Sequence, residues 1–167
     1  DAIRAIARHA GLDDAQVDQG ASDPFEGVGT IDTRVVLLGL PRAQVEKLLP
    51  LGLELAPQPL TFPDRHPVFV MFSHDHFEAW FGDMDYNEMM VAVPYVQRTA
   101  VNVANRGPFV YMPRLYLDDP TPCRLGNLLY GFEKQLAEIS NEADAYAVST
   151  ADGKQLIAKA TFVESGP

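Results

Sequence analysis

The sequence predicts an α+β fold, with a mostly antiparallel sheet or open barrel and a few helices. Short apolar segments rich in β-branched residues recur along the chain, and a hairpin signal at 151–153 separates the last two. Helix signals do not alternate regularly with these strand signals, as a doubly wound parallel sheet would require. The 167 residues suit one domain with a sizeable core.

The first thirty residues predict a helix and an arm. Four apolar residues follow helical spacing before Gly11 ends the pattern: Ile3, Ile6, Ala7 and Ala10. Residues 16–29 are polar and rich in Gly and Asp, as expected for a loop. We therefore divide the chain into an N-terminal helix and arm, 1–30, and a main domain, 31–167.

The main domain opens with a β-branched run at 33–38, which predicts a strand. Pro41 then begins a short helix over 42–49, because the first turn of a helix tolerates proline. The proline-rich segment 51–67 predicts irregular structure or a broken strand. Further strands are expected at 68–72, 89–96, 109–112 and 115–117, with a kink at Pro113, and in a hairpin formed by 145–150 and 154–162.

The clearest helix is predicted over 123–139. Six apolar residues recur there at helical spacing: Leu125, Leu128, Leu129, Phe132, Leu136 and Ile139. Lys134 falls opposite this stripe, so the periodicity favours a solvent-exposed lysine. An inward-facing Lys134 requires Gly131 to break the helix.

Composition excludes several classes of function. The net charge of −10 argues against a nucleic-acid partner, whose phosphates need a basic surface. No run approaches the roughly 18 apolar residues of a spanning helix, so we expect no membrane segment. No signal peptide is visible, and the lone Cys123 fits a reducing compartment, so we expect a cytoplasmic location. Motifs for phosphate or dinucleotide binding and for serine nucleophiles are absent.

Two polar clusters are candidate sites. His74, His76 and Glu78 share one face if their strand continues, a geometry that suits zinc or iron. No further ligand is evident, and we expect no metal. Acidic residues gather at Asp83, Asp85, Glu88, Asp118 and Asp119, where turns and solvated faces are the more typical explanation than paired acid and base groups.

Five segments, in the same order, resemble the acetoacetate decarboxylase family. Residues 126–137 resemble the family's lysine motif, and 115–119 resemble its Met-Tyr-Leu-Asp-Asn segment at the matching distance. Residues 86–88 resemble its Tyr-x-Glu, 45–54 its early helix, and 152–160 the strand after the lysine. Each segment alone is weakly specific, and their shared order carries the resemblance.

The resemblance implies a cone-like β-barrel and assigns roles to individual residues. Lys134 would form a Schiff base with a keto acid, Glu88 would position or protonate the carbanion, and Arg34 would hold the substrate carboxylate. The pocket would include Tyr86, Leu115, Tyr116 and Gln135. No cofactor is implied. The family continues for about another third of its length, so the resemblance implies that 31–167 lacks the C-terminal third of the fold.

The expected function follows from the lysine. A free lysine has a pKa of roughly 10.4, and an apolar pocket favours the neutral amine that attacks a carbonyl. We therefore expect a Schiff-base lyase acting on a small keto acid, by decarboxylation or by aldol and dehydration chemistry. The alternative is a non-catalytic small-molecule-binding module on the same fold. A homo-oligomer or a second fragment is expected to complete the barrel, because bare apolar strand edges aggregate.

Overall fold

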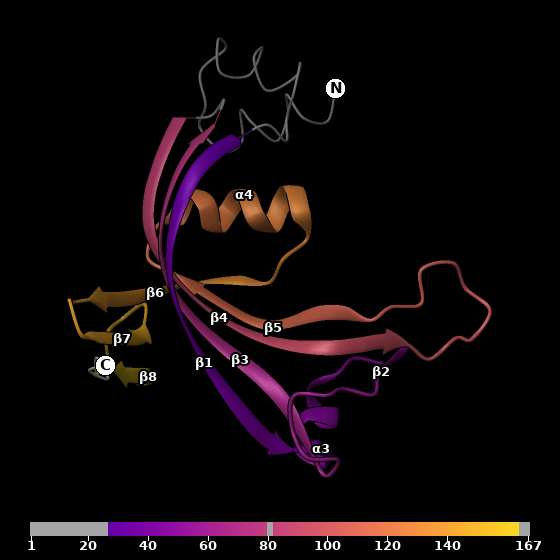
Figure 1. Cartoon of the computed structure of the whole chain (residues 1–167). Helices are drawn as coiled ribbons and strands as arrows, with labels where there is room; N and C mark the ends of the chain where they lie inside the picture. Colours follow the sequence, from indigo (N-terminus) through magenta and orange to yellow (C-terminus); the bar gives the residue numbers. More distant parts are fainter. Residues whose placement is uncertain (1–26, 80–81, 164–167) are drawn as a thin grey trace, which may run out of the picture.

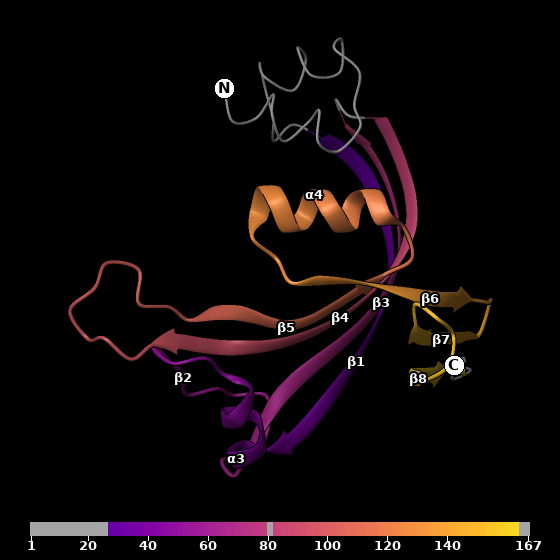
Figure 2. The same ribbon diagram turned by 180° about the vertical axis from the view of Figure 1, so that it is seen from behind.

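The computed structural model describes residues 27–79 and 82–163. Its sheet has the strand order β1-β3-β4-β5-β6-β7-β8, and β2 pairs with β4. Every pairing is antiparallel except that of β5 with β6. The sheet curls into a half-barrel with α4 on its concave side, and β6 runs from beneath α4 toward β7 and β8 on the convex side (Figures 1 and 2). The expected α+β class with a mostly antiparallel sheet is confirmed.

The elements have these bounds: β1 Gly27–Pro41, α3 Arg42–Val45, the 3-10 helix η1 Glu46–Leu48, β2 Leu53–Leu55, β3 Arg65–Ala79, β4 Gly82–Arg98, β5 Phe109–Leu117, α4 Pro120–Tyr130, β6 Lys134–Asn141, β7 Ala145–Thr150 and β8 Leu156–Thr161. The short helix after Pro41 and the hairpin around 151–153 are thereby confirmed. No helix in the described residues is long and apolar enough to cross a bilayer.

The predicted helix over 123–139 is wrong beyond Tyr130. Gly131 caps α4 in the left-handed conformation, with φ 68°, and Lys134 begins β6 three residues later. Glycine adopts this conformation without the steric cost of a Cβ atom, so it ends the helix and turns the chain back. The apolar spacing that continues past Gly131 therefore belongs to a strand, and only its first part is helical.

Three other boundaries differ from expectation. β1 begins at Gly27, inside the predicted arm, while the predicted N-terminal helix lies outside the described residues. β3 begins at Arg65, inside the segment expected to be irregular. Pro113 does not divide β5, because the pairing with β4 shifts register between Val91 and Val93. Proline is tolerated in strands at such irregularities, where its missing N–H is not needed.

The register defines which side chains share the concave face. One row across the sheet contains Met71, Met90, Leu115 and Lys134, and the next contains Ser73, Glu88 and Leu117. Directly paired residues project to the same side of a sheet, and successive residues alternate. The convex face carries the intervening residues, which pack into a core with β6 and β7 that contains Phe72, Met89, Ala137, Tyr146 and Val148.

The edge strand β1 exposes apolar side chains. Val28 is 72% exposed, Ile31 70% and Val35 53%, and Leu37 and Leu38 are also exposed. Among residues 27–79 and 82–163, β1 pairs on one side only, with β3. A long apolar edge strand is a template for pairing with another chain.

We therefore predict that the purified chain is larger than its monomer mass of 18.4 kDa. The double variant Val35→Lys/Leu37→Lys places two charges on the exposed side of β1 and should shift the population toward monomer. Size-exclusion chromatography with light scattering measures this. The control Leu51→Lys/Val101→Lys changes two exposed loop residues and should leave the mass unchanged. A wild-type chain that is monomeric at micromolar concentration would contradict the prediction.

Candidate functional site

A buried ion pair lies on the concave face beneath α4. Lys134 Nζ donates a hydrogen bond of 2.8 Å to Glu88 Oε2, and the two side chains are only 10% and 8% exposed. The groups come from β6 and β4, which are separated by β5 in the sheet. Charged residues are seldom buried unless they are paired, and such groups are concentrated at functional sites.

Two residues of α4 hold Lys134 in place. The Asn127 side chain accepts a hydrogen bond from the Lys134 N–H at 2.7 Å and donates one to its carbonyl at 3.0 Å. A Cβ atom on Gly126 would lie 2.7 Å from both Cδ and Cε of Lys134. The lysine stem therefore passes directly against the helix backbone, and only glycine leaves it room.

Aromatic and aliphatic groups complete the surroundings of the amine. The ring centroid of Tyr86 lies 5.8 Å from Lys134 Nζ and that of Phe132 lies 6.0 Å from it, distances suited to cation–π attraction. Leu115, the register partner of Lys134, is 3% exposed. Burial, followed by the negative charges of Glu88 and Asp75, raises the pKa of Tyr86, so this phenol stays protonated.

The backbone that carries Glu88 is fixed from the convex side. The Tyr146 hydroxyl lies 3.0 Å from the carbonyl oxygen of Ser73 and 3.1 Å from that of Glu88, and its proton is shared between these two acceptors. The neighbouring Asn87 donates to both carboxylate oxygens of Asp118, through its backbone and its side chain, each at 2.8 Å. These contacts hold β3, β4 and the end of β5 in register around the pair.

A second carboxyl group, Asp75, lies beside the pair on the same face. Asp75 pairs in register with Tyr86, two residues along the strands from the pair of Ser73 and Glu88. It is 7% exposed. Ser73 Oγ donates to Asp75 Oδ2 at 3.3 Å, while Oδ1 is buried and has no hydrogen-bond partner among the described residues. Burial, followed by the charge of Glu88, raises the pKa of Asp75 to about 6, against smaller opposing effects of Ser73, Lys134 and His74.

The structure brings together four of the seven predicted site residues: Lys134, Glu88, Tyr86 and Leu115. Tyr116 and Gln135 are paired with each other on the opposite face, where Tyr116 packs against the convex core and Gln135 is exposed. Arg34 also lies on that face, as the register partner of Phe72. Its guanidinium donates to the Ala143 carbonyl at 2.8 Å and lies 5.1 Å from the Phe162 ring centroid. Side chains alternate between the two faces of a sheet along each strand, so a residue one position away from a concave-face residue points to the convex face.

The histidine cluster lies on the convex side of β3 and β4. Asp85 accepts contacts from both rings, at 3.2 Å from His74 Nε2 and 3.4 Å from His76 Nδ1, and Glu78 lies 3.7 Å from His76. These side chains are substantially exposed. Within 27–79 and 82–163, no group of three or more His, Cys, Asp or Glu residues is arranged to hold a metal ion.

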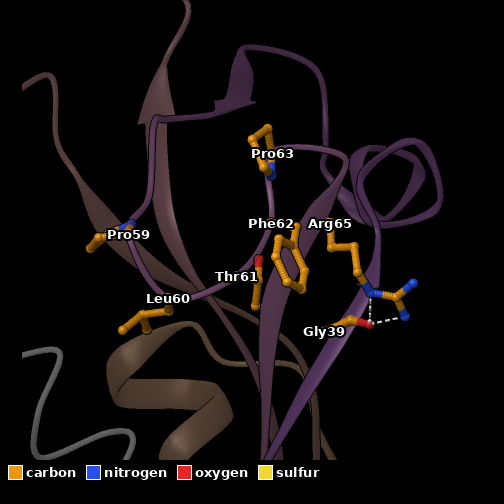
Figure 3. Close-up of a pocket in the computed structure, with 7 residues that line it drawn as sticks. All are labelled: Gly39, Pro59, Leu60, Thr61, Phe62, Pro63 and Arg65. Carbon is orange, nitrogen blue, oxygen red and sulfur yellow. Dashed lines mark hydrogen bonds between the residues drawn. The ribbon is translucent and has the colours of Figure 1, made fainter.

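A cavity of about 560 Å³ lies at the far end of β1, apart from the lysine (Figure 3). Its lining consists of Gly39, Pro59, Leu60, Thr61, Phe62, Pro63 and Arg65. The Arg65 guanidinium is held by the Gly39 carbonyl, which accepts from Nε at 2.7 Å and from a terminal nitrogen. None of the predicted site residues lines this cavity, so it adds no group to the lysine site.

The comparisons identify the class of protein that the curled sheet and buried lysine define. Residues 35–167 match the family model for acetoacetate decarboxylase, which covers most of the chain. The chain therefore belongs to the acetoacetate decarboxylase family. A comparison with curated proteins finds no significant match.

Solved structures confirm the fold. An acetoacetate decarboxylase from Legionella pneumophila is similar with a TM-score of 0.55 at 19% identity, over 79% of this chain and 46% of that one. The enduracididine biosynthesis enzyme MppR, in a HEPES-bound structure, gives a TM-score of 0.56 at 14% identity, over 80% of this chain and 52% of that one. The chain thus spans about half the length of these neighbours.

Sequence reasoning did not find Asp75 or the two α4 residues. The strand signal around His74 and His76 also places Ser73 and Asp75 on the other face, and this alternation was the available clue to Asp75. Gly126 and Asn127 belong to the segment that resembles the family's lysine motif, but the sequence assigned them no contact with Lys134. Their roles depend on α4 folding back over β6, which the apolar spacing of residues 123–139 did not reveal.

The Gly126→Ala variant tests the packing of the lysine. The added methyl group should displace Lys134 from Glu88 and lower the free energy of unfolding by about 1–3 kcal/mol, less the roughly 1 kcal/mol that alanine contributes within a helix. Chemical denaturation measures the change in stability, and reductive trapping of a keto acid on Lys134 measures the displacement of the lysine. Leu128→Ala, at an exposed position of α4, is the control, and unchanged trapping in Gly126→Ala would refute the packing argument.

Asp75 should make stability depend on pH. Its pKa of about 6 in the folded chain exceeds the ordinary 3.8, so between these values the folded state keeps a proton that the unfolded state releases. Stability therefore falls as pH rises from 4 to 7, by at most about 3 kcal/mol. Asp75→Asn should flatten this dependence, whereas Asp83→Asn, at an exposed position of the same hairpin, should not. Thermal denaturation at pH 4, 5.5 and 7 measures the slope, and parallel curves for wild type and Asp75→Asn would contradict the assignment.

Proposed function

We propose that this protein is a Schiff-base lyase that acts on a small keto acid through Lys134. The observation that carries the proposal is the buried pair of Lys134 Nζ and Glu88 Oε2, 2.8 Å apart on the concave face. A lysine with a solvated structural role would not be enclosed by a helix, two aromatic rings and a carboxylate. Membership of the acetoacetate decarboxylase family supports lyase chemistry of this type.

Glu88 is suited to prepare the lysine for attack. Its carboxylate accepts the hydrogen bond from Nζ and is the group to which the ammonium can transfer a proton before it meets a carbonyl. The neutral amine then adds to the keto carbon, and loss of water gives an iminium ion. Tyr86 and Phe132 face the amine with their rings, and cation–π attraction would stabilise the positive charge of the iminium as it stabilises the ammonium.

The iminium ion acts as the electron sink for carbon–carbon bond cleavage. When the bond breaks, its electron pair moves toward nitrogen and gives a neutral enamine, and carbon dioxide or an aldehyde departs. The enamine carbon then takes up a proton, and water hydrolyses the resulting iminium to release the ketone product and the free lysine. Aldol cleavage follows the same steps with one addition: the substrate's β-hydroxyl group gives up its proton to water as the aldehyde departs, and the product released is then a keto acid.

The substrate class is proposed from the structural neighbours. One MppR structure is described as complexed with pyruvate and another with the condensation product of pyruvate and imidazole 4-carboxaldehyde. Both chains are under 25% identical to this one, so they support a keto acid as the class of ligand and do not select one compound. We also propose that a second subunit or polypeptide segment covers the open concave face during the reaction, in the cytoplasm.

Reductive trapping tests the proposed function. Incubation with pyruvate or acetoacetate and borohydride should add the reduced keto acid, or its decarboxylated remainder, to the peptide that contains Lys134. Peptide mass spectrometry locates the adduct. Lys134→Gln should abolish it, because the amide cannot form an imine, and Glu88→Gln should reduce it by about 100-fold through loss of the proton acceptor.

Lys154→Gln is the matched control, since Lys154 is 81% exposed and lies in the hairpin turn away from the site. It should leave trapping unchanged. No adduct at Lys134 in the folded wild-type chain, with either keto acid, would overturn the lyase proposal. Binding of a keto acid without an adduct would favour the non-catalytic binding module.

A further inference from the structure

Asp75 is a buried acid that the lysine and glutamate chemistry does not use. It shares the concave face with Glu88, and only 7% of its surface is exposed to solvent. One of its oxygens, Oδ1, lacks a hydrogen-bond partner among the described residues. A buried polar atom without a partner is costly, so its persistence calls for a role.

We propose that Asp75 is the general acid of this site, and that it delivers the proton to the enamine carbon after carbon–carbon bond cleavage. The inference rests on the proposed function and extends it, because it assigns the protonation step to a residue outside the family's lysine and Tyr-x-Glu motifs. Asp75 would act directly on the reacting carbon, whereas Glu88 would act on the lysine nitrogen.

The two carboxyl groups differ in their hydrogen-bond partners. Glu88 accepts the 2.8 Å hydrogen bond from Lys134 Nζ, so its carboxyl group is engaged with the lysine. Asp75 lies diagonally across the β3–β4 pair from Glu88, at a spacing that long side chains bridge. Two like charges this close disfavour each other, so the proton resides on the carboxyl group that has no cation bonded to it.

Ser73 sets the orientation of the acid. Its hydroxyl donates to Asp75 Oδ2 at 3.3 Å, which leaves Oδ1 as the oxygen that carries the transferable proton. The same hydroxyl lies 3.4 Å from the Glu88 carbonyl, so Ser73 connects the acid to the strand that holds the ion pair. With a pKa of about 6, Asp75 is about half protonated at pH 6 and about one-tenth protonated at pH 7.

The step balances without a further reactant. The enamine carbon forms a C–H bond with the proton of Asp75 Oδ1, the carbon–carbon double bond becomes a single bond, and nitrogen regains its positive charge as the iminium. Asp75 is left as a carboxylate and takes its next proton from water. In the reverse direction the carboxylate removes a proton from the carbon next to the iminium.

The reverse direction provides the test. Pyruvate bound as an imine should exchange its methyl protons for deuterium in D₂O, and proton NMR follows the loss of the methyl signal. We expect Asp75→Asn and Asp75→Ser to slow this exchange by about 100-fold, while imine trapping at Lys134 by cyanoborohydride stays within about twofold of wild type. The pH profile of exchange should lose its inflection near pH 6 in both variants.

Asp83→Asn, an exposed acid in the same hairpin, is the control and should match the wild type in both assays. Exchange within about threefold of wild type in either Asp75 variant, with trapping intact, would overturn the role of Asp75 and leave the lyase proposal standing. Absence of trapping in the wild-type chain would overturn both. Use of two variants keeps the conclusion independent of how one replacement side chain fits.

Discussion

The left-handed turn at Gly131 is the constraint on which the rest of the site depends. It ends α4 and returns the chain beside β5, so that β6 starts parallel to its neighbour with Lys134 opposite Leu115. The same turn lays α4 over the concave face, where Gly126 and Asn127 contact the lysine. A helix continued through Gly131 would have projected Lys134 into solvent, away from Glu88.

Burial of the charged pair gives the concave face its chemical character. Removal of two ions from water costs several kcal/mol each, and their attraction offsets this only with good geometry and further hydrogen bonds. Tyr146 and Asp118 hold the backbone around Glu88 from the convex side, which maintains that geometry. The convex core therefore contributes to the site although none of its side chains faces the lysine.

The acidic groups of the β3–β4 hairpin lie in different environments. Glu88 has a cationic partner, whereas Asp75 Oδ2 accepts from Ser73 and its buried Oδ1 has no hydrogen-bond partner in the described part of the chain. Asp85, on the convex face, contacts two histidines and is exposed. The three acids lie within one hairpin, and the alternation of strand side chains gives each a different degree of burial and different partners.

Local sequence patterns were sufficient for much of the fold. The β-branched runs, the proline before α3 and the turn at 151–153 predicted most strands and the last hairpin, because these features depend on neighbouring residues alone. The order of five motifs predicted the family, and with it Lys134 and Glu88. Arg34, Tyr116 and Gln135 were assigned to the same pocket, yet they lie on the opposite face, because face depends on register.

What the sequence by itself determined was the class of fold and the family, and it also predicted Lys134 and Glu88, which the structure places in hydrogen-bond contact. Tertiary structure alone decided that Asp75 joins them and that Arg34 does not. The reason is physical. A strand's side chains alternate with a period of two, and the pairing of distant strands selects which half of them shares a buried face. That selection is a long-range property, and no local pattern around Asp75 or Arg34 contains it.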